Sequence, residues 1–340
     1  MTSLTSREWA LAARPDGMPK ASDFQMLTNE AGAPADGEIQ VRNEWMSVDP
    51  YMRGRMMDRE SYIPPFQLGE TMQGGSVGRV TASGHPDYAV GDLVSSFGGW
   101  REAWTAAPET MLTQKLPETP IPDSAFLGVV GMPGLTAYAG LLEIGAPKEG
   151  ETVFVSGAAG AVGATVCQIA KIKGCHVVGS AGGAEKGEFL KSIGVDSVVD
   201  YRAHSDAASL TAALGEAAPN GIDVYFDNVG GDHLQAAIAV ANQNARMPLC
   251  GMISQYNATG ATPGPDNMIM AVGKSLKMQG FIVSNYAHLQ PNFVKDMSEW
   301  IPAGKLQFRE TVHEGIESAP TAFMGLFTGQ NLGKMLVKLS

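Results

Sequence analysis

The chain has 340 residues, more than a single hydrophobic core usually organises, so two domains are expected. Apolar residues form 44 % of the chain and charged residues 17 %, a balance that supports a large buried core and excludes an intrinsically disordered protein. The net charge is −11 and there is no long run of Lys or Arg, so neither nucleic acid nor an anionic membrane is expected as a partner.

The N-terminal third of the chain is rich in Pro and Gly and contains short runs in which apolar and polar residues alternate. Glu38–Arg42, Gly78–Val80 and Gly91–Val94 are such runs. Short strands separated by turn residues predict a small β-rich domain. The C-terminal run Lys334–Leu339 has the pattern of one more strand, which could rejoin this domain.

The stretch from Ser124 to Leu142 contains no charged residue and has nearly the length of a membrane helix. Pro133 and several glycines interrupt it, so we expect buried chain that crosses between the domains. The N-terminus has no apolar core typical of a secretion signal, and the three cysteines form no C-x-x-C pair. We therefore expect a cytoplasmic protein with reduced cysteines.

From about residue 150 the pattern changes to an alternation of strands and helices. Strands are expected at Thr152–Ser156, His176–Ser180, Val198–Asp200, Ile222–Asp227 and Arg246–Cys250. Helices are expected at Val162–Lys173, Glu185–Ile193, Asp206–Gly215 and Asp232–Asn242. This alternation predicts an α/β fold with a doubly wound parallel sheet, the Rossmann architecture.

The turn between the first strand and the first helix of this region is rich in Gly and Ala, with the sequence VFVSGAAGAVG at residues 153–163. Ala158, Gly160 and Gly163 occupy the three positions of the G-x-G-x-x-G dinucleotide motif, with Ala in place of the first Gly. Such a motif provides a tight turn, a backbone that a pyrophosphate can approach and a helix N-terminus that favours negative charge. The turn therefore predicts dinucleotide binding.

The end of the second strand indicates which dinucleotide is expected. An NAD site usually has Asp or Glu there, about 20 residues beyond the motif, to bind the ribose 2′-hydroxyl. This chain has Ser180 followed by small residues, which leaves room for a 2′-phosphate. Lys186, Tyr201 and Arg202 are the nearest basic and hydroxyl candidates, and they favour NADP. In the alternative interpretation, Lys186 is only a solvated helix residue beside Glu185.

The chain lacks the ligand pattern of a zinc site, so no metal is expected. No Cys precedes Cys167, and the six His residues are scattered singly. Without a Lewis acid, reduction of a carbon–carbon double bond conjugated to a carbonyl is easier than alcohol oxidation. Hydride adds to the β-carbon, and hydrogen-bond donors stabilise the charge on an enolate oxygen. A tyrosine hydroxyl or water then supplies the α-proton.

Several segments distributed over most of the chain share one family's pattern. They are DPYMRGRM (49–56), LGVVGMPGLTAYAGLLEIG (127–145), AAGAVG (158–163), VVGSAGGAEK (177–186), FDNVGG (226–231), CGMISQYN (250–257) and NLGK (331–334). Together they resemble the zinc-independent medium-chain dehydrogenase/reductase superfamily. Within it they are similar to the branch of prostaglandin reductases and alkenal double-bond reductases, and most similar to the bacterial NADPH-dependent curcumin reductases.

This resemblance implies a GroES-like, β-rich substrate domain, formed by residues 1–130 and 306–340, and a Rossmann NADP-binding domain, formed by residues 131–305. It also implies NADPH as the cofactor, a small enone or enal as the substrate, and a cytoplasmic homodimer. The residues implied at the phosphates are Gly160, Ala161, Val162 and Gly163 for the pyrophosphate, and Lys186 and Tyr201 for the 2′-phosphate. The other cofactor-binding residues implied are Asn228, Cys250, Gly251, Ile253, Ser254, Tyr256, Phe281, Val283 and Asn331.

One position departs from the family pattern. Several members have a tyrosine eight residues before the position of Phe281, where it is proposed to assist the enolate, and this chain has Gly273 there. The proton must therefore come from another side chain, from water or from the nicotinamide ribose hydroxyl. Tyr51, Tyr62 and Tyr256 are the catalytic candidates. The alternative for each is an amphipathic aromatic residue at a domain boundary.

The expected activity is NADPH-dependent reduction of the carbon–carbon double bond of α,β-unsaturated ketones or aldehydes. We expect the substrate in a cleft between the domains. An adaptable apolar wall of this cleft is expected from Met46, Met52, Met56, Met57 and Phe66. The alternatives are an NADPH-dependent quinone reductase, a protein that binds NADPH without turnover, and an enzyme that oxidises a lipid alcohol.

Overall fold

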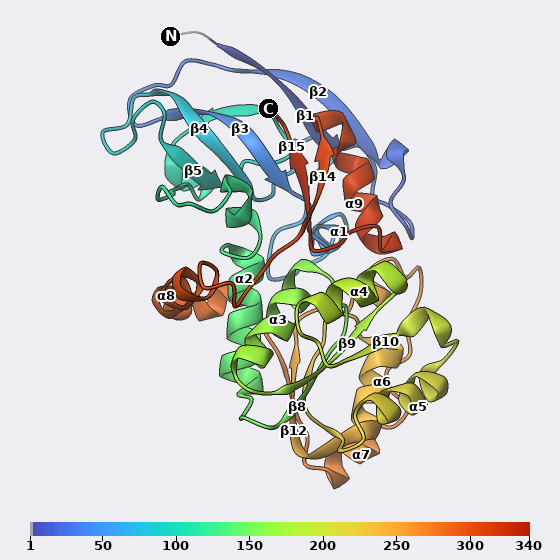
Figure 1. Ribbon diagram of the computed structural model, residues 1–340. Coiled ribbons are helices and arrows are strands. Elements are labelled where there is room, and N and C mark those ends of the chain that lie inside the picture. The colour runs from blue at the N-terminus through green and yellow to red at the C-terminus, as the bar shows by residue number, and fades with distance from the viewer. Residues whose placement is uncertain (1–2) are drawn as a thin grey trace. The chain divides into compact units, whose positions relative to one another are not determined.

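The computed structural model describes residues 3–340, which form two compact units (Figure 1). The first unit contains the chain up to Leu127, Glu310–Asn331 and Met335–Ser340, and the second contains Gly128–Arg309 and Leu332–Lys334. The short segment Leu332–Lys334 thus lies with the second unit, although it falls within the range expected for the first domain.

A seven-stranded sheet organises the first unit. Its strands are β3 (Ile39–Ser47), β4 (Ser76–Ser83), β5 (Leu93–Ser96), β6 (Ala103–Ala106), β7 (Gln114–Lys115), β14 (Glu310–Glu314) and β15 (Lys334–Lys338). The strand order is β14-β15-β3-β4-β5-β7, with β6 also paired to β3. Because β15 runs antiparallel to β3, with Leu336 opposite Ser47, the predicted return of the C-terminal strand to the β-rich unit is confirmed.

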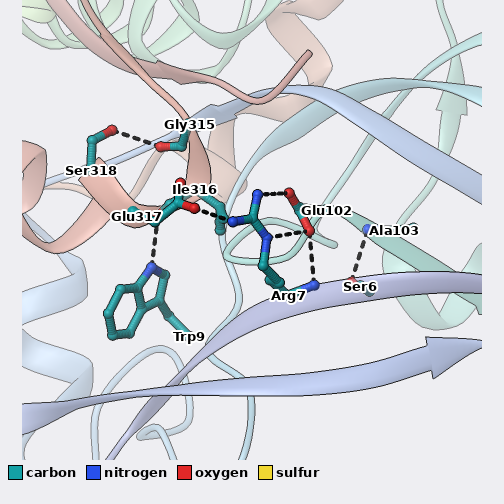
Figure 2. Close-up of polar contacts among 9 residues, drawn as sticks. All are labelled: Ser6, Arg7, Trp9, Glu102, Ala103, Gly315, Ile316, Glu317 and Ser318. Carbon is teal, nitrogen blue, oxygen red and sulfur yellow. Dashed lines mark hydrogen bonds and ion pairs between the residues drawn. The ribbon is translucent and has the colours of Figure 1, made fainter.

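Two further strands form an antiparallel hairpin, β1 (Leu4–Leu11) and β2 (Phe24–Ala31). Figure 2 shows Arg7 of β1 between two carboxylates. Its guanidinium lies 2.6 Å from Glu102 and also forms an ion pair with Glu317. Trp9 Nε1 donates a hydrogen bond of 2.7 Å to the carbonyl of Ile316. These contacts join the hairpin to the C-terminal part of the same unit.

Aromatic side chains form the centre of the first unit's core. Phe24 stacks on Trp100 with the ring centroids 6.0 Å apart, and Phe323 packs edge-on against both rings. Phe323 belongs to α9 (Ala319–Thr328), while α1 (Met52–Arg55) contributes a buried methionine to the same cluster. Both helices are therefore held by one apolar cluster.

The residues expected to form an adaptable wall of the substrate cleft lie mostly inside the first unit. Four of them are buried in the core of the first unit with no more than 4 % exposure, namely Met46, Met52, Met56 and Phe66. Met57 is 37 % exposed. The prediction is wrong for the four buried residues, because the three methionines and Phe66 fill space inside a packed core.

A six-stranded parallel sheet organises the second unit. Its strands are β8 (Thr152–Val155), β9 (His176–Ala181), β10 (Ser197–Asp200), β11 (Ile222–Phe226), β12 (Ala241–Leu249) and β13 (Lys277–Gly280). The order is β10-β9-β8-β11-β12-β13, and each neighbouring pair is parallel. Numbered within this unit, the order is 3-2-1-4-5-6, the doubly wound arrangement of Rossmann folds. The predicted fold class is confirmed.

One helix of the second unit, α2, precedes the first strand, and the others alternate with the strands or follow them. They are α2 (Met132–Tyr138), α3 (Ala161–Ile172), α4 (Ala184–Ser192), α5 (Ala207–Ala217), α6 (Gly231–Val240), α7 (Ile269–Gly273) and α8 (Gln290–Trp300). The four predicted helices correspond to α3–α6. Asp206 caps α5 by accepting a 2.8 Å hydrogen bond from the backbone of Ser209, and α4 ends before Gly194, whose φ is +88°.

The charge-free stretch Ser124–Leu142 is largely buried helical chain. Within it, α2 has Pro133 in its first turn and continues into a π-helix, Ala139–Gly145. A Cβ at Gly140 would lie 2.5 Å from the ring of Phe281, so this helix packs too closely for any side chain there. Across the residues that the structure describes, no helix combines the length and the apolar character needed to span a membrane.

Candidate cofactor site

The residues predicted to bind the cofactor in the second unit follow the carboxyl ends of its six strands. These ends are at Val155, Ala181, Asp200, Phe226, Leu249 and Gly280. Parallel strands place their carboxyl ends on one edge of the sheet, and the strand order reverses there between β8 and β11. The sheet therefore gathers these residues on the edge where doubly wound folds bind ligands.

The turn after β8 provides a sharp reversal into α3. Gly157 has φ of +58°, a left-handed conformation that favours glycine. Ala158 is fully buried, and its N–H donates 2.9 Å to the carbonyl of Ser180 on β9. The left-handed residue is thus Gly157, one position before the first position of the motif, which explains why Ala is accepted there. Gly157 was not among the predicted residues, although a Gly directly after a strand is a recognisable turn signal.

The start of α3 leaves its backbone open. A Cβ at Gly163 would lie 2.3 Å from the carbonyl oxygen of Gly157, so only glycine fits this helix–turn contact. Gly160 is the N-cap residue, and no side chain caps the helix. The first N–H groups of a helix have no partner within it, so those of Ala161, Val162 and Gly163 can bind an anion.

The C-terminal segment reaches the same turn. The N–H of Gly333 donates 2.8 Å to the carbonyl of Ala159, and Gly333 forms a β-bridge with Gly160. Gly333 has φ of +70°, and a Cβ there would meet the carbonyl of Arg309. Asn331, predicted to bind the cofactor, lies two residues before this bridge. Asn331 itself belongs to the first unit, and its cofactor role stays a prediction.

A second group of residues lies where β9 and β10 end. A Cβ at Gly182 would be 2.6 Å from Arg202 Nε and 3.0 Å from the phenol carbon Cζ of Tyr201, so both side chains pack on bare backbone. Asp200 Oδ1 accepts hydrogen bonds from the N–H groups of Gly183, at 3.1 Å, and Arg202, at 3.0 Å. The two loops are thereby fixed to each other.

The corner at the ends of β9 and β10 consists of Lys186, Tyr201 and Arg202. Burial lowers the pKa of the Lys186 ammonium, and the charge of Arg202 acts in the same direction, while Glu185 opposes them. None of the ion pairs found among residues 3–340 includes Lys186. Lys186 is half-buried rather than fully exposed, and its role at a 2′-phosphate stays a prediction. Two neighbouring cations and a phenol at the end of β9 match the charge of a 2′-phosphate.

His233 supports this corner and was missed in the sequence analysis. Its Nε2 lies 2.9 Å from Ser180 Oγ, and its ring packs edge-on against Tyr201 with centroids 5.4 Å apart. Burial lowers the pKa of His233 to about 4, so the imidazole is neutral at pH 7. A single His in the first turn of a helix has no motif, so only the folded structure reveals this role.

A buried carboxylate organises the turn after β11. Asp227 Oδ1 accepts hydrogen bonds from the hydroxyls of Tyr225, at 2.7 Å, and Ser156, at 3.1 Å, and from two backbone N–H groups of the turn. Burial raises the pKa of Asp227, whose Oδ2 has no hydrogen-bond partner in the described part of the chain. Asn228 donates from Nδ2 to the carbonyl of Ser156, at 2.8 Å. Asn228 is therefore held against the end of β8.

The predicted residues after β12 form one continuous segment: Cys250, Gly251, Ile253, Ser254 and Tyr256. The N–H groups of Cys250 and of the next residue donate to the carbonyl of Asp227, at 2.9 and 3.0 Å. The N–H of Met252 lies 3.4 Å from the hydroxyl of Tyr256. Burial raises the pKa of the Cys250 thiol to about 12, with a further contribution from Asp227, so the thiol is protonated at neutral pH.

Phe281 and Val283 follow β13. Phe281 is 9 % exposed and packs edge-on against Phe226 and Tyr286, with centroids 6.2 and 5.9 Å away. Its side chain is thus mainly a core element, and Val283, half-buried, begins the following 3₁₀ helix. The cofactor role of both residues stays a prediction.

Gly273 lies at the other edge of the sheet. It ends α7, which precedes the amino end of β13, and the next residue, Lys274, accepts a backbone hydrogen bond from Asn244 near the start of β12. Gly273 is exposed, and a Cβ there would meet nothing within 4 Å. A tyrosine at this position would therefore not lie on the carboxyl edge of its own sheet, so its absence removes nothing from that edge.

The three tyrosine candidates divide between the units. Tyr51 directly precedes α1 and is half-buried, whereas Tyr62 is 60 % exposed. The charge of Arg55 interacts with both phenols. Tyr256 belongs to the second unit. Tyr51 and Tyr62 therefore interact with one cation, Arg55, which was not among the predicted site residues.

Two family models match this chain. One, described as the N-terminal domain of oxidoreductase, matches residues 7–114, and the other, described as zinc-binding dehydrogenase, matches residues 161–301. In the described residues, no group of three or more His, Cys, Asp or Glu side chains could hold a metal ion. The expectation that the protein uses no metal stays a prediction.

Similar proteins cover almost the entire chain. The NADPH-dependent curcumin reductase of Escherichia coli is 43 % identical, over 98 % of this chain and 97 % of its own length. The 2-alkenal reductase (NADP⁺-dependent) of Nicotiana tabacum is 44 % identical, over 95 % and 94 %. The crystal structure of CurA in complex with NADPH, from Vibrio vulnificus, is 45 % identical, covers 98 % of this chain and 99 % of its own, and has a TM-score of 0.92.

Fold and site together define a protein with a Rossmann nucleotide-binding half and a GroES-like, β-rich half. The coverage and the sequence identity of the similar proteins then define the family to which the chain belongs. The chain belongs to the medium-chain dehydrogenase/reductase superfamily, in the branch that contains the prostaglandin and alkenal reductases.

Proposed function

We propose that this protein is an NADP-dependent oxidoreductase that uses NADPH to reduce the carbon–carbon double bond of α,β-unsaturated ketones and aldehydes. The observation that carries the cofactor choice is the corner of Lys186, Tyr201 and Arg202, where Ser180 stands in place of the acid of an NAD site. The names of the similar proteins, a curcumin reductase and a 2-alkenal reductase, support this class of substrate.

In this proposal, residues that follow each strand of the parallel sheet bind a part of NADPH. The backbone from Gly160 to Gly163 binds the pyrophosphate, and Lys186 and Tyr201 bind the 2′-phosphate, with Arg202 as a second cation. The remaining residues proposed along the cofactor are Asn228, Cys250, Gly251, Ile253, Ser254, Tyr256, Phe281, Val283 and Asn331. Two backbone hydrogen bonds, from Cys250 and Gly251 to the carbonyl of Asp227, anchor the start of the 250–256 segment. NADPH supplies the hydride that adds to the β-carbon of the substrate.

Addition of hydride leaves negative charge on the carbonyl oxygen of the substrate, and a proton must then reach the α-carbon. We propose Tyr51, Tyr62 and Tyr256 as the candidate proton donors. Tyr51 and Tyr62 share the neighbouring charge of Arg55, whereas the hydroxyl of Tyr256 faces backbone at Met252. A nearby cation lowers the pKa of a phenol, and Arg55 acts on Tyr51 in this direction, against burial and the charge of Asp49, which raise the pKa of Tyr51.

The first test is the decrease in absorbance of the reduced nicotinamide, with NADPH or NADH, against curcumin, an alkenal, a cyclic enone and a quinone. We expect oxidation of NADPH by the enones and the alkenal, with little oxidation of NADH. Turnover with the quinone alone would replace the proposed substrate class by quinones. Measurable binding of NADPH without turnover in the whole panel would indicate a non-catalytic NADPH-binding protein.

A homodimer belongs to the same proposal. β13 is the outer strand of its sheet, and α7 beside it exposes Ile269 and Val272 at 77 % and 76 %. An outer strand beside apolar side chains is a surface on which a second copy can pair. Sedimentation should show a dimer, and Val272→Asp should shift it toward monomer, because a charge is costly in an apolar interface. A monomeric wild-type protein would contradict this proposal.

We also propose a cytoplasmic location. The three cysteines, Cys167, Cys175 and Cys250, are free thiols, as is usual for a protein in a reducing compartment. Cell fractionation with an antibody against the protein tests the location, and recovery with a membrane or secreted fraction would contradict it.

A further inference from the structure

Arg55 is a buried cation in the first unit. It is 5 % exposed and ends the short helix α1. Its Nε donates 2.9 Å to the carbonyl of Pro64, and its Nη2 donates 3.2 Å to Gln73 Oε1. The guanidinium lies over the ring of Phe66, 4.1 Å from the centroid. The side chain is therefore fixed in orientation by neutral partners on several sides.

No carboxylate balances this charge within the described residues. Arg55 takes part in none of the ion pairs found there, and its Nη1 has no hydrogen-bond partner. Arg53, two residues earlier, is equally buried, but Asp16 and Asp23 act on its charge. A buried charge without a counter-charge is costly, and an unpaired donor in it calls for an explanation.

Two phenols interact electrostatically with this charge. Tyr51 precedes Arg55 by one helical turn, and positions four residues apart share a face of a helix. The Arg55 charge interacts with the phenols of both Tyr51 and Tyr62. Burial and the charge of Asp49 raise the pKa of Tyr51 well above its ordinary value, and Arg55 acts in the opposite direction. These are the phenols that the proposed function uses as proton donors.

We propose that Arg55 is the buried cation that stabilises the phenolate formed when Tyr51 delivers the proton of enone reduction. This inference rests on the proposed function. In the step, the O–H bond of Tyr51 breaks as a C–H bond forms at the α-carbon of the enolate. The two electrons of the reduction come from the hydride of NADPH, and water returns the proton to Tyr51. Arg55 touches neither substrate nor cofactor in this role and is a positioning residue.

The difference in exposure separates Tyr51 from Tyr62. Tyr62 is 60 % exposed, so water can solvate its phenolate without help from the protein. Tyr51 is half-buried, and a phenolate there needs a fixed positive charge. A preoriented charge that costs no reorganisation at the moment of reaction is an effective means of stabilising such an anion.

The first experiment measures the charge effect without turnover. A difluorinated tyrosine, whose phenol ionises near neutral pH, replaces Tyr51, and its pKa is read from phenolate absorbance or fluorine NMR. Arg55→Gln should raise this pKa by about 1–3 units, and Arg55→Lys by less, because Lys keeps the charge. Arg59→Gln is the matched control, since it removes a cation from an exposed position in the same segment. An unchanged pKa in Arg55→Gln overturns the proposal.

The second experiment measures catalysis with saturating NADPH. Arg55→Gln should lower kcat roughly 10- to 100-fold with little change in KM or in the NADPH dissociation constant, because the charge acts on the proton-transfer step. In a Tyr51→Phe background the same substitution should cause no further loss. Losses that multiply in the double variant, or a rise in KM alone, overturn the proposal.

The same kinetic series separates the two inferences. A wild-type protein that reduces no enone rejects the proposed function and this step together. An active wild type whose kcat is unaffected by Arg55→Gln rejects only the role of Arg55. Because Arg55→Gln leaves a gap beside Phe66, its thermal unfolding is compared with that of Arg55→Met, which fills the space without a charge. Both variants should lose the same catalytic step if charge is the cause.

Discussion

In the second unit the proposed cofactor residues follow the ends of six parallel strands, whereas in the first unit Tyr51 and Tyr62 lie on irregular chain around a four-residue helix. The first arrangement depends on backbone geometry, which the alternation of strands and helices already specifies. The second depends on how individual side chains pack around Arg55. Substitutions should therefore separate binding of the cofactor from proton transfer.

The largest expected effect is at the glycine turn. Gly163→Ala places a Cβ 2.3 Å from the carbonyl oxygen of Gly157 and 2.8 Å from Ala158 Cα, so the backbone must move. We expect a loss of about 1–3 kcal/mol in unfolding free energy, measured in urea, and loss of detectable NADPH binding by fluorescence. Gly215→Ala is the control: its Cβ would lie 3.9 Å from Val240, and it should stabilise α5 slightly. Normal NADPH affinity in Gly163→Ala would contradict the proposed pyrophosphate site.

Next in size is Lys186→Ala. Loss of a charge-assisted hydrogen bond should raise the NADPH dissociation constant roughly 10- to 100-fold and leave that of NADH nearly unchanged, as calorimetry can measure. Lys191→Ala is the matched control on the same helix, because its ammonium is exposed and pairs with Glu188. Equal weakening of both cofactors would show that Lys186 does not act on the 2′-phosphate.

Acid sensitivity should come partly from His233. Its pKa is lowered to about 4 by burial, so the unfolded chain binds a proton that the folded protein excludes. The stability that this group provides is complete above about pH 6.5 and is lost as the pH falls toward 4, by about 3 kcal/mol in total. His233→Phe keeps a ring beside Tyr201 without titrating. Its unfolding free energy should fall less between pH 7 and pH 4.5, and an equal fall in both proteins would contradict this source.

The smallest expected effect is in the hairpin of the first unit. Arg7→Ala removes ion pairs with Glu102 and Glu317 at a partly exposed position (Figure 2). The unfolding free energy should fall by about 1 kcal/mol, because exposed ion pairs contribute little. NADPH affinity should not change, since these contacts lie outside the second unit. A weakened affinity would show that the two units are not separable in this respect.

The regular part of the second unit was predictable because periodicity and turn residues agree there. The ends of α3–α6 differ from the predicted ends by one or two residues, and the two-residue differences are at the C-terminal ends of α5 and α6. β12 is an exception: it begins at Ala241, although Arg246 was predicted, because its first residues are polar and continue directly from α6. Polar residues at the start of a strand resemble a helix end in a single sequence.

The rest of the site depends on tertiary contacts that no local pattern encodes. His233 is a single polar residue whose partners, Ser180 and Tyr201, are distant in sequence, and it belongs to no motif. Arg55 stands within the segment DPYMRGRM, but the sequence of that segment does not show that its guanidinium is buried. Gly273 shows a different limit. Its distance of eight residues from Phe281 identifies it as the position of the family tyrosine, but this spacing does not show at which edge of the sheet the residue lies. The four buried residues expected in the substrate cleft show a third limit, since apolar character alone does not distinguish a pocket wall from a core.

Ser180 has a consequence for changing the cofactor preference. Its carbonyl accepts the N–H of Ala158, its hydroxyl meets His233, and its side chain is fully buried. An acid introduced at this position, the obvious route to an NAD enzyme, would have to be accommodated inside the protein next to a neutral imidazole. The preference for NADP over NAD is therefore easier to change by substituting the exposed Arg202, or Lys186, than by substituting Ser180. Position 180 is constrained by the packing of the fold.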